Sequence, residues 1–201
     1  MEAEEFWNEC HINQNKKYLS NCSFALTVDF LKVKEFIKPS LNILEIGVGC
    51  GNVVKGLHDL GVNTFALDIS ETALNNVKQY CEEVYHVNDI SKLKKNFFDL
   101  IICMNVVQHI PTPDLIEEFR YIIPSLKKEG LFAFEFVSDN FHLDSWKESF
   151  LFKGLPSFCR SPELMKTLLL LLKSKGEVVV SNKCYFKKVK GCHVIHARRE
   201  E

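Results

Sequence analysis

The sequence predicts an α/β fold in which seven strands form a mainly parallel, doubly wound sheet that ends in an antiparallel hairpin. Three observations lead to this prediction. Five apolar runs alternate with helical patterns, as strands joined by helical crossovers do. A glycine-rich turn at 47–51 follows the first of these runs. The last two β-rich runs have no helix between them, so they should pair in antiparallel orientation.

The length and composition fit a single domain over residues 1–201. Apolar residues make up 46% of the chain and charged residues 25%, which is the balance of a globular protein with a sizeable core. No repeat, low-complexity segment or linker divides the chain. We expect one domain that begins with a polar N-terminal arm at 1–23.

The elements before the glycine turn are a helix and a strand. A helical pattern covers 24–38, and Pro39 should end it. The first strand follows at 41–46. One face of the predicted helix carries the apolar residues Leu26, Phe30, Val33 and Ile37.

Two strand–helix units follow the turn. Gly61 should end the first helix as a C-terminal cap, and Ser70 should cap the second. The predicted elements are a helix over 51–60, a strand over 63–68, a helix over 71–81 and a strand over 83–87.

The second half of the chain repeats this pattern before it ends in the hairpin. Thr112 should cap a helix with Pro113 at its first position, and Gly130 should close that helix. A last helix should run from Ser161 to Lys175 and end at Gly176. The predicted strands are 97–105, 131–137, 177–186 and 191–197.

Charge and cysteine usage exclude several classes of protein. Lysine and arginine number 25 against 26 acidic residues, so a nucleic-acid partner is not favoured. The eight cysteines include no C-x-x-C pair, which predicts buried, reduced thiols and no metal site. Reduced thiols and an acidic N-terminus without an apolar core predict a cytoplasmic protein. The longest apolar run, at 168–172, is too short to cross a membrane.

The glycine turn, ILEIGVGCG at 43–51, differs from the dinucleotide fingerprint G-x-G-x-x-G. The third glycine comes one residue early, and Asn52 stands where it should be. Glu45, just before the glycines, would repel a pyrophosphate. It suits a positively charged ligand without phosphate, such as S-adenosylmethionine, which carries a sulfonium and an ammonium group.

With these residues the chain resembles the class I S-adenosylmethionine-dependent methyltransferases, of the kind described as methyltransferase type 11 or 12. The family motif E-x-G-x-G-x-G is matched by Glu45, Gly47, Gly49 and Gly51. The likeness covers roughly residues 30–198. It implies a three-layer, Rossmann-like, seven-stranded sheet, S-adenosyl-L-methionine as the cofactor and S-adenosyl-L-homocysteine (SAH) as its product.

The resemblance also implies further cofactor-binding residues. Asp68 would bind the ribose hydroxyls, with Ile69 beside it. Asp89 would face the adenine amino group. The family pattern extends this set to Ile90 beside the ring, Asn105 in the segment under the ligand, and Trp7 in an N-terminal arm that closes the pocket.

The acceptor side of the site is less well defined by the sequence. His109 follows the fourth strand and is the candidate catalytic residue, which would orient or deprotonate the acceptor. The aromatic-rich stretch 138–160 is expected to cover the substrate. In place of the [D/N]-P-P-[Y/F] motif of amino-methyltransferases stand Met104–Val106.

We therefore expect methyl transfer to a small-molecule acceptor such as a metabolite, a sugar or a lipid-like compound. Three alternatives stay open. They are a methyltransferase for tRNA or another macromolecule, a dehydrogenase-like nucleotide binder, and a non-catalytic partner subunit that keeps the fold. The sequence does not indicate the acceptor atom or the oligomeric state.

Overall fold

The computed structural model describes residues 3–12, 23–137, 158–180 and 192–199. Seven strands form one sheet in the order β3-β2-β1-β4-β5-β7-β6. The strands are β1 Asn42–Ile46, β2 Asn63–Asp68, β3 Glu83–His86, β4 Phe98–Cys103, β5 Leu126–Val137, β6 Ser174–Val180 and β7 Cys192–Arg199. The expected fold class, a three-layer Rossmann-like sheet with a terminal hairpin, is confirmed.

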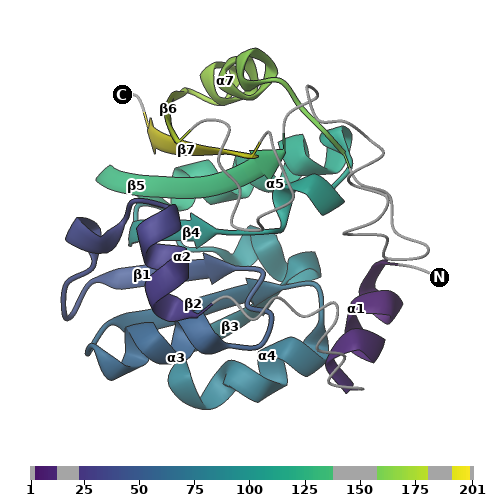
Figure 1. Cartoon of the computed structure of the whole chain (residues 1–201), viewed down its shortest axis with the longest axis vertical. Coiled ribbons are helices and arrows are strands. Elements are labelled where there is room, and N and C mark those ends of the chain that lie inside the picture. The colour runs from purple at the N-terminus through teal and green to yellow at the C-terminus, as the bar shows by residue number, and fades with distance from the viewer. Residues whose placement is uncertain (1–2, 13–22, 138–157, 181–191, 200–201) are drawn as a thin grey trace.

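Helices cover both faces of the sheet (Figure 1). The α-helices are α1 Ala3–Ile12, α2 Phe24–Phe30, α3 Asn52–Asp59, α4 Glu71–Val77, α5 Thr112–Ser125 and α7 Pro162–Leu171. Short 3-10 helices are η1 Lys34–Phe36, η2 Lys78–Tyr80, η3 Val87–Lys92 and η4 Val107–His109. The helices α2, α3 and α4 pack on one face of the sheet, and α5 and α7 pack on the other.

The strand pairing places the site. The strands β3, β2, β1, β4 and β5 are parallel, and β7 pairs antiparallel with β5 and β6. The chain order of the strands reverses between β1 and β4, where Glu45 lies opposite Ile102. In open α/β sheets the crevice at such a switch point, outside the carboxyl ends of the strands, is where ligands bind.

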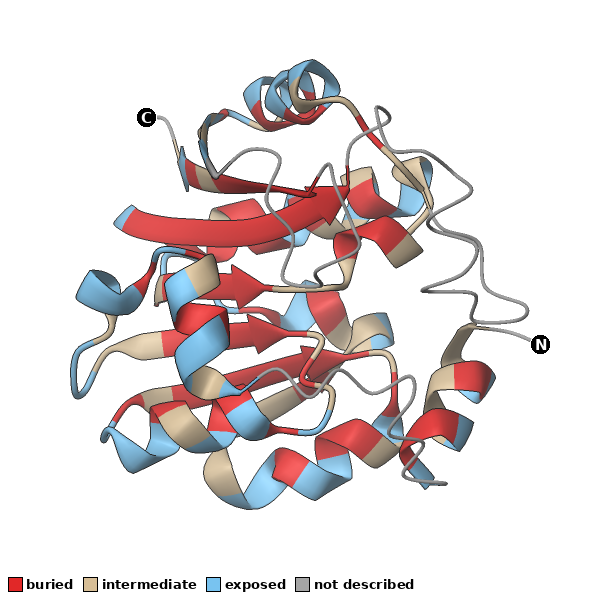
Figure 2. Ribbon diagram, in the orientation of Figure 1, coloured by how far each residue is buried: buried red, intermediate tan, exposed pale blue. Residues whose placement is uncertain are grey.

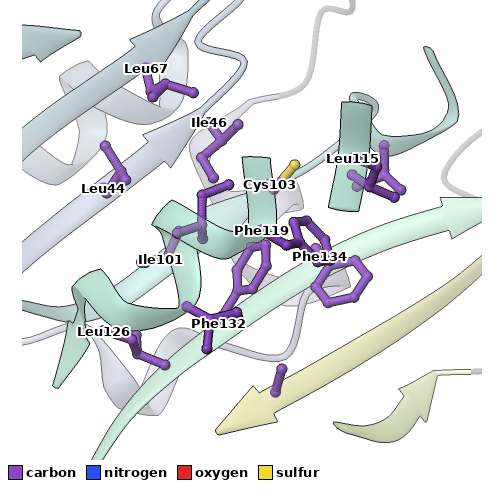
Figure 3. Packing of buried hydrophobic residues seen from close by; sticks show 14 of the residues in the cluster. Leu44, Ile46, Leu67, Ile101, Cys103, Leu115, Phe119, Leu126, Phe132 and Phe134 are labelled. Carbon is purple, nitrogen blue, oxygen red and sulfur yellow. The ribbon is translucent and has the colours of Figure 1, made fainter. Parts of the chain in front are cut away.

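A cluster of phenylalanines fills the core between the sheet and α5 (Figure 3). Phe119 of α5 lies edge-on to Phe132 and Phe134 of β5, with ring centroids 5.4 and 5.5 Å away. All three side chains are at most 2% exposed. Figure 2 shows that the strands are buried almost throughout, whereas the outer faces of the helices are exposed.

The helix predicted over 24–38 is wrong in length and in its buried face. Ser23 caps α2 by accepting a hydrogen bond from the Leu26 N–H, and the helix ends at Phe30. Lys32 then adopts a left-handed conformation with φ of 57°. The chain turns there, so Val33 is fully buried on the sheet while Leu26 is 52% exposed.

Two predicted helix-ending glycines lie inside strands instead. The helix α5 ends at Ser125, and Gly130 belongs to β5, where an added Cβ would lie 2.9 Å from the Phe98 carbonyl oxygen. The helix α7 ends at Leu171, and Gly176 belongs to β6, where an added Cβ would lie 2.4 Å from Leu169. Both glycines serve close packing rather than a turn.

The predicted caps give mixed results. Ser70 caps α4 as expected, by accepting from the Ala73 N–H. Ser161, predicted as the first residue of the last helix, caps α7 by accepting from the Leu164 N–H. Gly61 ends α3 with φ of 73°. Thr112 is already helical, and its hydroxyl accepts a hydrogen bond from Arg160 rather than capping the helix.

None of the helices in the described ranges is long and apolar enough to span a membrane. The six cysteines within those ranges are free thiols. Cys103 lies buried inside β4, as predicted.

Replacing Phe119 with Ala should lower the free energy of unfolding by ~3–5 kcal/mol, because the cavity would open inside a closely packed aromatic cluster. Urea unfolding monitored by circular dichroism measures this change. Tyr121→Ala on the same helix is the control, since that side chain is 36% exposed. Equal losses of stability in the two variants would contradict the packing described here.

Candidate functional site

The glycine turn joins β1 to α3 in a backbone conformation that favours glycine. Gly47, Gly49 and Gly51 have φ of 76°, 52° and 77°. A Cβ on Gly47 would lie 2.1 Å from the Val106 side chain, and one on Gly51 would lie 2.6 Å from Val77. A Cβ on Gly49 would meet no protein atom within 4 Å. Gly47 and Gly51 therefore allow close packing, whereas Gly49 borders open space.

That space is a pocket at the carboxyl ends of β1 and β4. It lies between the glycine turn, the first turn of α3, the end of β4 and one side of α2. The lining residues are Thr27, Glu45, Gly47, Val48, Gly49, Cys50, Asn52, Val53, Met104 and Asn105. Four of the predicted cofactor-binding residues, Glu45, Gly47, Gly49 and Asn105, are thus brought together.

Glu45 presents a buried carboxyl group to this pocket. It is 7% exposed, and the backbone of Val54 hydrogen bonds to it. Its Oε2 atom has no hydrogen-bond partner among the described residues. Burial raises the pKa of Glu45 well above its usual value. A buried carboxyl oxygen without a partner is costly, so the site favours a ligand with a hydrogen-bond donor or a positive charge.

Thr27 adds a second polar atom that the sequence did not single out. The residue belongs to α2 and is 2% exposed, and its Oγ1 has no partner in the described part of the chain. Together with Glu45 it gives the pocket two buried polar atoms whose hydrogen-bonding capacity is unused.

Asp68, at the end of β2, is tied to the glycine turn. Its Oδ1 accepts a hydrogen bond of 2.8 Å from the Ser70 N–H, and the backbones of Val48 and Gly49 also bind it. The carboxyl is 8% exposed. Burial raises its pKa, while these hydrogen bonds and the nearby His11 act in the opposite direction. Asp68 is therefore a structural link as well as a candidate ribose ligand.

The N-terminal arm provides a helix at the mouth of the site. Asn8 of α1 accepts hydrogen bonds from the Ser70 hydroxyl at 2.7 Å and the Thr72 N–H at 3.2 Å. Trp7 lies edge-on to His109, with ring centroids 5.5 Å apart. The helix lies beside α4, at the edge where the parallel strands end (Figure 1).

The end of β4 is held by a buried acid on β5. Asn105 has a left-handed φ of 60°, and its N–H donates to Glu135 Oε2 at 3.1 Å. Burial raises the pKa of Glu135 to about 7, against the lowering effect of hydrogen bonds from Cys192 and Asn105. Sequence reasoning missed Glu135, although a charged residue inside the apolar run LFAFEFV was a signal.

His109, at the end of η4, is half-buried, and its Nδ1 atom is enclosed by the protein. Burial lowers its pKa from 6.5 to about 4. The buried side chain of Arg160 holds the same loop by donating to the carbonyls of Val107 and Ile110. Of the predicted cap at 138–160, residues 138–157 lie outside the described residues.

Asp89 and Ile90 are not among the residues that line the pocket. Asp89 lies in η3, is half-exposed and pairs with Lys92 at 2.8 Å. Ile90 is buried in the core cluster on the α5 side of the sheet. The Ile69 carbonyl contacts His86 Nε2 at 2.8 Å. Their predicted roles at an adenine and a ribose stay predictions.

Comparison with known proteins shows what the domain is similar to. Residues 44–134 match the family described as a methyltransferase domain. Among curated proteins, the chain is similar to a ubiquinone biosynthesis O-methyltransferase from Coxiella burnetii, with 27% identity over 107 residues. The matched part is 50% of this chain and 45% of that protein, so the chain spans about half the length of the relative.

Solved structures share the whole fold. A magnesium protoporphyrin IX methyltransferase from Synechocystis with bound SAH has a TM-score of 0.71 and 15% identity, and the match covers 98% of both chains. A methyltransferase in complex with the Trm112 methyltransferase activator of Haloferax volcanii has a TM-score of 0.73 and 14% identity, and the match covers 100% of both chains. At these identities the likeness establishes the fold.

Replacing His109 with Asn should flatten the pH dependence of stability between pH 7 and 4. The unfolded chain protonates His109 as the pH falls through 6.5, whereas the folded chain does so only near pH 4. The stability that neutral His109 contributes above pH 6.5 is therefore lost as the pH falls to about 4, by ~3 kcal/mol.

Urea unfolding of wild type and variant over this pH range measures the difference. The buried carboxyl groups are present in both proteins, so their contributions to the pH dependence of stability cancel in the difference between wild type and variant. The exposed His58→Asn variant is the control and should follow wild type. Parallel stability curves for wild type and His109→Asn would contradict a neutral, half-buried His109.

Proposed function

We infer that this chain, a class I S-adenosylmethionine-dependent methyltransferase by its domain and its fold, transfers a methyl group from S-adenosylmethionine to a small-molecule acceptor. The observation that carries this proposal is the unused Oε2 of the buried Glu45 beside the open space at Gly49. A cationic ligand without phosphate meets both conditions, because it supplies the charge that the carboxyl needs and lies against a backbone without a Cβ.

The residues of the pocket fit S-adenosylmethionine. Glu45, Thr27 and Asn105 would hold its charged and polar groups, and Gly49 would let it approach the backbone. Asp68 does not line the pocket but binds the backbone of the glycine turn, and it is the candidate for the ribose. When bound, the cofactor supplies a methyl carbon that its sulfonium has already activated. The chain then has to hold the acceptor in line, at ~3–3.5 Å, and exclude water.

The residues around His109 are suited to positioning the acceptor. Trp7 packs against the imidazole, and Arg160 fixes the backbone on either side of it. With a pKa of about 4, His109 is a poor base at neutral pH, because a general base works best when its pKa is near the working pH. Of the two roles expected for His109, we propose orientation of the acceptor.

A macromolecular acceptor is the alternative. It is favoured by one observation, the likeness to a methyltransferase that was solved with the Trm112 activator. The balance of 25 basic and 26 acidic residues favours the small molecule. We place the protein in a reducing compartment such as the cytoplasm, in agreement with its six described free thiols.

Titration calorimetry with SAH tests the proposal. We expect saturable binding of SAH and no response to NAD. The Gly49→Ala variant should bind SAH at least about tenfold more weakly, because the added methyl group projects into the pocket.

Gly61→Ala is the matched control for backbone strain. Gly61 has φ of 73° and lies outside the pocket, so both variants carry a left-handed alanine that costs ~1–2 kcal/mol of stability. Gly61→Ala should bind SAH as wild type does. Equal SAH affinity in the two variants, or binding of NAD by wild type, would contradict the assignment of the pocket.

Replacing His109 with Ala should lower turnover while SAH affinity stays within about twofold of wild type. The loss follows because the acceptor is no longer oriented against the methyl carbon. The measurement is incorporation of label from radioactive S-adenosylmethionine into a metabolite extract, together with SAH calorimetry. Wild-type turnover in this variant would refute a role for His109.

A further inference from the structure

The guanidinium group of Arg160 is buried directly behind the loop that carries His109. The residue is 2% exposed. Its Nη1 donates to the Val107 carbonyl at 2.9 Å, its Nη2 to the Ile110 carbonyl, and its Nε to the Thr112 hydroxyl at 3.2 Å. Arg160 therefore binds the backbone on both sides of His109, at Val107 before it and at Ile110 after it.

No carboxylate balances this buried charge within the described ranges. The hydrogen-bond partners of the side chain are carbonyl and hydroxyl oxygens. On α5, the half-buried Glu118 lies near Asp114, and the electrostatic influence on Arg160 comes from Cys159. Burial lowers the pKa of Arg160, but a guanidinium stays protonated in proteins. The backbone of the His109 loop thus lies against a buried positive charge.

Two acids of the site lie on strands away from Arg160. Glu45 lies near the end of β1 and Asp68 ends β2, whereas the backbone N–H of Arg160 donates to the Val137 carbonyl of β5. Both acids are at most 8% exposed. The site therefore has a half with buried carboxyl groups, which suits a cation, and a half with a buried guanidinium, which suits an anion.

Neither His109 nor Cys103 is suited to deprotonate a neutral acceptor at neutral pH, and the Glu135 carboxyl already accepts hydrogen bonds from Asn105 and Cys192. His109 has a pKa of about 4. The thiol of Cys103, at the end of β4, is buried, and its pKa is raised well above the usual value. An acceptor that already carries its negative charge at neutral pH needs no base.

We propose that the acceptor is a small-molecule carboxylate, and that Arg160 selects it by placing behind the His109 loop a positive charge that no carboxylate of the described residues pairs with. The inference rests on the proposed methyl transfer and adds the class of its substrate. The product is a methyl ester.

The step is balanced without a proton transfer. A carboxylate oxygen attacks the methyl carbon and forms a C–O bond, the bond between carbon and sulfur breaks, and its electron pair stays on sulfur. One cation and one anion become two neutral groups. A buried site favours such a step, because the reactants exchange their hydration for fixed protein charges that complement each of them.

The stability of the product toward alkali tests the proposal. The full chain is incubated with a metabolite extract and S-adenosylmethionine labelled in its methyl group, and the product fraction is treated with base. A methyl ester releases the label as volatile methanol, whereas methyl ethers, amines and thioethers retain it. We expect most of the transferred label to be volatile.

The outcomes separate this inference from the proposed function. Label that resists alkali would overturn the carboxylate and leave methyl transfer intact. Absence of transferred label would contradict both. SAH binding, measured separately, reports on the cofactor pocket alone.

A binding measurement without turnover tests the role of Arg160. Thermal unfolding of the protein saturated with SAH is followed with a panel of aryl and alkyl carboxylic acids and with the primary amide of each acid. Acids should raise the melting temperature and their amides should not. Equal stabilisation by acids and amides, or none by the acids, would contradict the proposal.

Three variants distinguish charge from loop structure. Arg160→Gln should abolish the preference for acids over amides and raise the KM for the acceptor on the order of tenfold, with SAH affinity unchanged. Arg160→Lys keeps the charge and should retain the preference. Thr112→Val removes one contact of Arg160 but no charge, so it too should retain the preference. Loss of the preference in Thr112→Val and Arg160→Gln alike would show that the loop, and not the charge, is responsible.

Discussion

The arrangement of the site depends on how closely the ends of β1 and β2 are joined. The Gly47 N–H donates to the Leu67 carbonyl at 2.8 Å, and Asp68 binds the backbone of the glycine turn. The turn is pressed so firmly against the end of β4 that a Cβ on Gly47 would overlap Val106. Because these bonds fix the backbone, the carboxyl of Glu45 is held in the pocket and Gly49 borders open space. The same bonds keep Asp68 buried, since its oxygen atoms are already hydrogen-bonded.

Burial of charge is the second constraint, and it explains why the site is polarised. Carboxyl groups in an apolar environment are costly unless they are neutral, hydrogen-bonded or paired. Glu135 meets this condition through Asn105 and Cys192, whereas Glu45 keeps one oxygen without a partner. Arg160 satisfies its donors with neutral oxygens and so keeps its charge uncompensated among the described residues. Within the described ranges, the Glu45 carboxyl lacks a positively charged partner and the Arg160 guanidinium lacks a negatively charged one. A site that binds a cationic cofactor beside an anionic acceptor needs both.

The strands and the glycine motif could be predicted from the sequence because their signals are local. The run NTFALD predicted β2 with its observed bounds, and the glycine turn identified the pocket. Gly130 and Gly176 were misread because a glycine required for close packing looks the same in a sequence as one that ends a helix. Arg160 could not be placed because its partners lie about fifty residues earlier and meet it only after folding. Thr27 was missed for a different reason, since the helix that carries it ends earlier than its apolar pattern predicted.

The helix α1 connects the two halves of the site, and this position gives it a role that its own sequence does not reveal. Asn8 binds the first turn of α4, and His11 lies near enough to Asp68 to alter the pKa of both groups. Trp7, which precedes Asn8 on the same helix, packs on His109 in the loop that Arg160 binds. A shift of α1 would therefore weaken the contacts of both halves at once. Asn8, Trp7 and His11 thus tie one helix to α4, to His109 and to Asp68.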